Sequence, residues 1–294
     1  MRNDWAAVYR GQELILDVCR DIEALIFGGG TAIHRCVLSK ERRESEDIDF
    51  FVDHLCGSSE STKYALEMRK AFSTHPKIDV INYDFRPEEK SHRFACIVEG
   101  SDEVIKVELL DFTVGRFSDE SFVASSLYPR VENSYNLILY KLKALSDRTD
   151  TIKDLYDLYF LFREHKIPID TRTLFFDLDM KFKAATGYNY GAAEILKALE
   201  AKHRNWDIIP KNVYNSNTDL ISNAVYDFRD ELVNVLTDPY LEQIDLSHEQ
   251  YFKNKLEALD FNTTIEEYLD VIEPNSFIAT LAKESILQKH HHEN

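Results

Sequence analysis

The chain has 294 residues, of which 44% are hydrophobic and 12% aromatic, so it is long and apolar enough for one large or two ordinary folded domains. Its 35 basic and 52 acidic residues give a net charge of −17, which disfavours a protein that coats bulk nucleic acid. No apolar run approaches the roughly 18 residues that cross a membrane, and we expect a cytoplasmic protein. The four cysteines have no paired short spacing, so we expect reduced thiols and no zinc site.

The first half of the chain mixes short strands with a few helices. Residues 4–26 carry apolar side chains at helical spacing and are predicted to form one helix. The glycines at 28–30 then predict a turn, with a short helix over 31–38 directly behind it. The elements that we expect next are a strand at 47–53, a helix at 58–73, and strands at 78–85, 94–99 and 103–112.

The second half is nearly all helical after Tyr128-Pro129. The helices that we expect there cover 133–148, 152–165, 171–185, 191–202, 218–236, 248–259 and 265–271. The fold class is therefore α+β, with a mixed-sheet domain over residues 1–128 and a mostly helical domain over residues 129–294.

The Asp-x-Asp pair Asp47 and Asp49 is the most informative feature of the first half. Ile48 separates the two acids and Phe50 follows them, so both carboxylates point to one face of an apolar strand. Two adjacent carboxylates repel each other unless a cation lies between them, and hard oxygen ligands suit Mg²⁺. The glycine turn offers backbone N–H groups to a phosphate, so the pattern favours metal-dependent chemistry on a nucleotide.

A third carboxylate is expected, because phosphoryl-transfer sites with two metals usually use three. Glu108 interrupts the apolar strand at 103–112, where an acid is costly unless it is paired or liganded. Asp111 is the alternative, although it lies near the strand end, where an acid costs less.

Cations in the helical half supply the complementary charge. Lys141 and Arg148 share one helix face, on which they can hold a triphosphate or simply meet solvent. Lys153, Asp154 and Asp157 follow on the next helix, where the acids can orient Lys141 or Arg148 by ion pairing. His34 is expected to pack or to lie in a loop, and not to act as a ligand.

Taken together, these motifs resemble the AbiEii/AbiGii-type toxin family of DNA polymerase β-like nucleotidyltransferases. That family shows a Gly-Gly-Thr-Ala turn and then Arg-x-Ser-x-Asp-hydrophobic-Asp-Phe, which correspond here to residues 29–32 and 43–50. It also shows Lys-Leu-x-Ala-Leu, a following Arg, and a basic residue before Asp-x-x-Asp-Leu, which correspond to residues 141–145, Arg148 and residues 153–158. The matching motifs span residues 28–161.

The resemblance implies transfer of a nucleoside monophosphate from an NTP, with release of pyrophosphate. Asp47, Asp49 and Glu108 would bind two Mg²⁺ ions, one at the acceptor and one at the leaving phosphates. The residues that would contact or orient the triphosphate are Gly29, Gly30, Thr31, Arg43, Lys141, Arg148, Lys153, Asp154 and Asp157. In the toxin branch the acceptor would be tRNA or a protein, and a cognate antitoxin would exist.

Two other interpretations stay open at this point. The charge of −17 suits a cationic small acceptor, such as an aminoglycoside- or lincosamide-type antibiotic, better than it suits tRNA. A module that binds a nucleotide without catalysis could keep the same fold, although it would have no need of three acids in these places.

Overall fold

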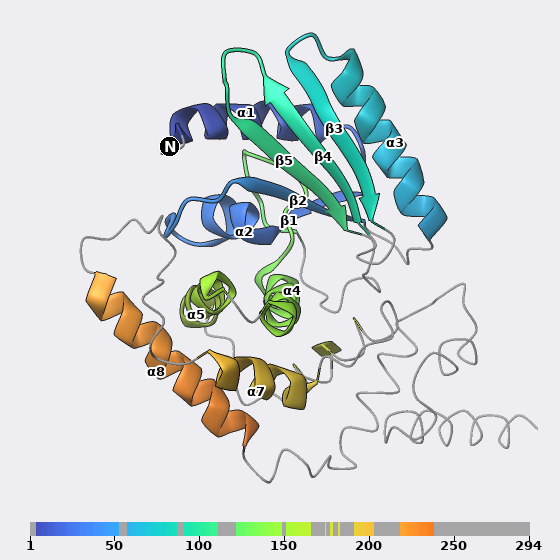
Figure 1. Cartoon of the computed structure of the whole chain (residues 1–294). Coiled ribbons are helices and arrows are strands. Elements are labelled where there is room, and N and C mark those ends of the chain that lie inside the picture. The colour runs from blue at the N-terminus through green and yellow to red at the C-terminus, as the bar shows by residue number, and fades with distance from the viewer. Residues whose placement is uncertain are drawn as a thin grey trace, which may run out of the picture.

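The computed structural model describes residues 4–52, 58–86, 91–110, 122–148, 151–165, 174, 177–178, 182, 191–202 and 218–237. Its centre is a mixed five-stranded sheet with helices on one face and at one end (Figure 1). In this part of the chain no helix has both the length and the apolar character needed to cross a bilayer. The described cysteines, Cys19, Cys36 and Cys96, are free thiols, and Cys56 lies outside the described residues.

The strand order in the sheet is β1-β2-β5-β4-β3. The strands are β1 (Leu25–Gly28), β2 (Asp47–Val52), β3 (Ile78–Arg86), β4 (Ser91–Val98) and β5 (Val104–Leu110). Only β2 and β5 run parallel, and the other neighbours are antiparallel. The hairpin β3–β4 lies between β2 and β5 in the sequence, so chain segments far apart in sequence meet at the centre of the sheet.

Helices α1 (Trp5–Cys19) and α3 (Ser58–Thr74) cover one face of the sheet. Asp4 caps α1 by accepting a hydrogen bond from the N–H of Ala7 (3.2 Å). At the β1–β2 end, the short helix α2 (Gly29–Ala32) continues into a π-helical turn, η1 (Ile33–Val37). The apolar sides of α1 and α3 and the inner sides of the strands form one hydrophobic core.

The second core lies among the helices beyond β1 and β2. These helices are α4 (Ser134–Asp147), α5 (Lys153–His165), α7 (Ala192–Ala201) and α8 (Thr218–Leu236). Phe51 of β2 joins this core by stacking on Tyr140 of α4, with ring centroids 3.7 Å apart. Asn133 caps α4 by accepting from the N–H of Asn136 (2.9 Å). The helices that follow the sheet in sequence are thus packed directly against its β1–β2 end.

Within the described residues, the predicted elements are confirmed with three differences. The glycines at 28–30 were predicted to form a turn, but Gly28 ends β1, and Gly29 and Gly30 begin α2. Residues 25–26 were predicted to continue the first helix, but α1 ends at Cys19 and Leu25–Gly28 is a strand. All four residues of β1 are buried, so they lack the alternation that marks a half-exposed strand. Strand β4 begins at Ser91, three residues before the predicted start. The predicted helices at 248–259 and 265–271, and most of 171–185, lie outside the described residues.

Candidate active site

Asp47 and Asp49 project from one face of β2, as their spacing predicts, and both are half-buried. In the sheet register Asp49 lies between Gly28 of β1 and Glu108 of the parallel strand β5. Asp47 lies opposite Lys106. The three predicted acids therefore meet on two adjacent strands, although Glu108 comes 59 positions after Asp49 in the chain. The alternative third acid, Asp111, lies outside the described residues.

Glu108 has a cationic neighbour that the sequence analysis missed. Arg93 of β4 is its register partner, and the Arg93 Nε donates to Glu108 Oε1 at 2.8 Å. Arg93 was missed because the predicted strand began at residue 94, whereas β4 begins at Ser91 and includes Arg93. The signal that could have found it is a charged side chain on the same face as an acid in the neighbouring strand.

The predicted glycine turn, which the structure shows as the start of helix α2, is pressed against the acids. Gly29 has φ +68°, in the left-handed region, and a Cβ added there would lie 1.7 Å from Asp49 Oδ2. A Cβ on Gly30 would lie 2.7 Å from Nη2 of Arg43. The buried Thr31 hydroxyl donates to the backbone carbonyl of Asp47. The turn therefore fixes the backbone of β2 and keeps space free beside Asp49.

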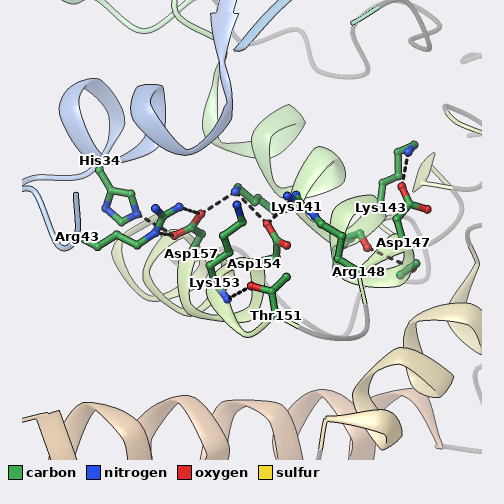
Figure 2. Close-up of polar contacts among 12 residues, drawn as sticks. His34, Arg43, Lys141, Lys143, Asp147, Arg148, Thr151, Lys153, Asp154 and Asp157 are labelled. Carbon is green, nitrogen blue, oxygen red and sulfur yellow. Dashed lines mark hydrogen bonds and ion pairs between the residues drawn. The ribbon is translucent and has the colours of Figure 1, made fainter. Parts of the chain in front are cut away.

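Two buried acids of α5 organise the cations. Asp154 Oδ1 lies 3.1 Å from Lys141 Nζ and 3.2 Å from Nη2 of Arg148 (Figure 2). Asp157 Oδ2 lies 2.7 Å from the same Lys141 Nζ. Both acids are completely buried, and the Lys141 side chain is 8% exposed. The structure thus brings together the predicted basic and acidic groups of the two helices.

Arg43 is more deeply buried than we expect for a residue whose main role is to contact a nucleotide. Its Nε and Nη2 donate to the two carboxylate oxygens of Asp157 at 2.8 and 2.7 Å, and its side chain is only 7% exposed. These contacts hold the pKa of Asp157 well below its usual range, with help from Lys141 and against the effect of burial. Arg43, Thr31 and Asp157 therefore have little open surface, and their geometry suits support of the site.

Lys153, at the start of α5, is half-buried beside the other cations. Burial, followed by the charges of Arg148 and Lys141, lowers its pKa, while Asp154 and Asp47 act in the opposite direction. Lys153 is therefore electrostatically coupled both to the cations of the helices and to an acid of β2. This coupling places a cluster of positive charge, formed by Lys141, Arg148 and Lys153, next to the acids.

Asp49 has a strongly perturbed pKa. Burial, together with the negative charges of Asp47 and Glu108, raises its pKa to about 7, although Lys141 and Arg148 pull in the other direction. In addition, Oδ1 of Asp47 is buried without a hydrogen-bond partner. The described residues thus leave part of the negative charge of the acids uncompensated, and they leave one buried acceptor oxygen without a hydrogen-bond donor.

These properties fit a divalent cation. Among the described residues, no three His, Cys, Asp or Glu side chains lie close enough to chelate an ion as they stand. The donor set nevertheless consists of hard carboxylate oxygens, one of them unpartnered, and burial and mutual repulsion raise the pKa of Asp49. A Mg²⁺ ion bound between Asp47 and Asp49, with Glu108 beside them, would relieve that repulsion.

Comparison with protein-family models matches one family to most of the chain. The family model of the nucleotidyl transferase AbiEii toxin, of type IV toxin–antitoxin systems, matches residues 19–271. The chain belongs to the AbiEii family. It is accordingly a nucleotidyltransferase. Membership of this family suggests transfer of a nucleoside monophosphate from an NTP, in the context of a toxin–antitoxin system.

One solved structure supports the fold of this AbiEii chain at low sequence identity, and a second is reported as a weaker match. MenT4, a nucleotidyltransferase toxin from Mycobacterium tuberculosis H37Rv, is 16% identical with a TM-score of 0.52, over 87% of this chain and 93% of that one. JHP933 from Helicobacter pylori is 16% identical with a TM-score of 0.45, over 89% and 100% of the two chains. A search of curated proteins finds no match.

Replacing Gly29 with alanine should displace Asp49 and abolish most nucleotidyl transfer. Gly100→Ala is the matched control, because Gly100 also has a positive φ (+83°) but has no atom within 4 Å of an added Cβ. Both variants should lose about 1 kcal/mol of folding free energy, because alanine disfavours the left-handed backbone conformation. Thermal melting and transfer assays would show a further loss only for Gly29→Ala. Equal activity of the two variants would contradict the close packing of Gly29 on Asp49.

The stability of the metal-free protein should depend on Asp49 between pH 4 and pH 7. The pKa of Asp49 is about 7 in the folded chain, against an ordinary value of 3.8, so within this window the folded chain holds a proton that the unfolded chain has released. Raising the pH through the window therefore removes stability. In EDTA, the melting temperature of Asp49→Asn should exceed that of wild type by a difference that grows from pH 4 to pH 7. An advantage that does not change with pH would contradict the raised pKa.

Proposed function

We propose that this protein is a Mg²⁺-dependent nucleotidyltransferase that moves a nucleoside monophosphate from an NTP to tRNA or to a protein, and that a cognate antitoxin counteracts it. The observation that carries the proposal is the meeting of two oppositely charged groups of side chains. Asp47, Asp49 and Glu108 lie on adjacent strands of the sheet. Lys141, Arg148 and Lys153 lie close enough to couple electrostatically with Asp49 or Asp47. This is the arrangement that an NTP bound through metal ions requires.

The residues divide into three roles under this proposal. Asp47, Asp49 and Glu108 would hold two Mg²⁺ ions, which supply positive charge at the reacting phosphates when they are bound. Lys141, Arg148 and Lys153 would neutralise the triphosphate, with Gly29 and Gly30 beside it. Asp154, Asp157, Arg43 and Thr31 would hold these groups in place. Residues 1–128 would carry the acids, and residues 129–294 would complete the site.

The reaction is a substitution at the α-phosphorus of the NTP. A nucleophilic oxygen or nitrogen of the acceptor forms a bond to that phosphorus and releases its proton to water, and the bond to the bridging oxygen of the β-phosphate breaks. Pyrophosphate then leaves with the bonding electron pair. The clustered cations stabilise the negative charge that develops on the leaving group, because they are already oriented by Asp154 and Asp157.

The test is incubation of the purified protein with Mg²⁺ and each of four α-³²P-labelled NTPs, together with total tRNA, total protein extract or no acceptor. Label on RNA or on protein would support the proposal and identify both the base and the acceptor. Binding of Mg-NTP without label on any macromolecule would favour a small cationic acceptor, which the charge of −17 suits. Absence of both binding and transfer would contradict an enzymatic role.

A further inference from the structure

His34 lies at the junction between the glycine turn and the helices. It belongs to η1, the π-helical turn that directly follows α2. Its side chain is fully buried, and its Nε2 lies 2.8 Å from Oδ1 of Asp157. Its ring also faces Tyr156 of α5. Figure 2 shows His34 and Arg43 approaching Asp157 from one side, with Lys141 on the other. A π-helical turn of this kind often marks a functional position.

Asp157 links His34 to the cations of the proposed NTP site. Its Oδ1 accepts from His34 and from Nε of Arg43, and its Oδ2 lies 2.7 Å from both Lys141 Nζ and Nη2 of Arg43. Because Asp157 is completely buried, its orientation is set entirely by these neighbours. A change at His34 therefore reaches Lys141 through one shared carboxylate.

We propose that His34 is a positioning residue that orients Asp157, and through it the Lys141 ammonium, for binding of the NTP phosphates. The inference rests on the proposed function, since it concerns how that site holds its nucleotide. His34 acts in its neutral form, with the hydrogen on Nε2 donated to Asp157. Its Nδ1 is buried without a hydrogen-bond partner, so a second hydrogen there would have no acceptor.

The surroundings of His34 make this arrangement sensitive to acid. Burial lowers the pKa of His34, and the charges of Arg43 from the loop before β2 and Lys141 from α4 lower it further. Asp157 from α5 opposes them, and Tyr156 is the other ionisable side chain against the ring. Protonation would add a cation that competes with Lys141 for Asp157. We therefore expect NTP affinity to fall as the pH drops below the ordinary histidine range.

The experiment compares wild type with His34→Gln and His34→Leu from pH 5.5 to pH 8. The dissociation constant of a fluorescent mant-NTP with Mg²⁺, and KM and kcat for transfer, are measured at each pH. His34→Leu removes the hydrogen bond to a buried carboxylate and should raise the dissociation constant and KM about tenfold, with a smaller change in kcat. Glutamine can still donate to Asp157 but does not titrate. His34→Gln should therefore keep near-wild-type affinity at neutral pH and lose less affinity in acid than wild type, because the loss that comes from Asp49 is common to both proteins.

His92→Leu is the matched control. His92 is equally buried, but it lies on β4, where it contacts Tyr83 and Ser61, away from Asp157. Its substitution should lower the melting temperature and leave nucleotide affinity unchanged. If His34→Leu does not fold, the pH profile of His34→Gln still decides the question. Wild-type affinity in His34→Leu, or an acid loss in His34→Gln as large as that of wild type, would overturn the inference.

The measurements separate this inference from the proposed function. A wild-type protein that binds mant-NTP but transfers no label would contradict the proposed transfer, and the comparison of dissociation constants among the His34 variants would remain valid. A wild-type protein that binds no nucleotide under any condition would overturn both.

Discussion

Asp49→Asn is expected to lower nucleotidyl transfer about a thousandfold, which corresponds to roughly 4 kcal/mol of lost transition-state stabilisation. The substitution keeps the size of the side chain and removes one of the three negative charges that face the cations of α4 and α5. Steady-state transfer of labelled NMP, with the acceptor identified as described above, measures the effect.

The control for this prediction is Asp84→Asn. Asp84 lies in the same register row of the sheet, on the far side of Arg93, and forms an exposed ion pair with Arg86 (3.0 Å). Its loss should leave transfer near the wild-type rate. Asp49→Asn should also melt no lower than wild type at neutral pH, because it relieves repulsion from Asp47 and Glu108. A folded Asp49→Asn protein with full activity would refute the assignment of the acids.

Asp157→Ala is expected to destabilise the protein by about 3–5 kcal/mol, the usual cost of removing one partner from a buried ion pair. Asp157 is completely buried and pairs with Arg43 and Lys141, so both cations would remain in the interior without their shared anion. Chemical denaturation followed by circular dichroism measures the free energy of unfolding.

Glu231→Ala is the control for this second prediction. Glu231 pairs with Arg163 at 2.7 Å, but both side chains are largely exposed, at 42% and 52%. An exposed pair contributes little, so this substitution should change the free energy of unfolding by less than about 1 kcal/mol. Similar losses in the two variants would show that the Asp157 network does not hold the helices to the sheet.

The acids of the site could be predicted from the sequence because strand geometry is local. Alternation alone places Asp47 and Asp49 on one face, and an acid within an apolar strand is conspicuous at Glu108. The register that aligns Glu108 with Asp49 needs the parallel pairing of β2 with β5, which no local pattern encodes.

The contacts that support the site depend on tertiary structure. Arg43 and Asp157 are 114 positions apart in the chain. No sequence pattern around either residue indicates that its side chain is buried. Lys202 of the helical half is another example, since its buried ammonium donates to the backbone carbonyls of Arg148 (2.6 Å) and Thr151 (3.0 Å). Residues 25–26, the first half of the fully buried strand β1, were predicted as helix, because a short apolar run does not distinguish the two.

The separation of the partners in sequence also governs when the site can exist during synthesis. Asp49 meets Glu108 only after β5 has paired with β2, and Lys141 is oriented only after Asp157 has packed against Arg43. Such distant contacts form late in folding, because a long loop must close before they can be made. A nascent chain whose synthesis has not yet reached the end of α5 has the acids without their oriented cations. Under the proposed roles of these residues, we therefore expect the nascent chain to stay inactive on the ribosome until more than half of its sequence has been translated.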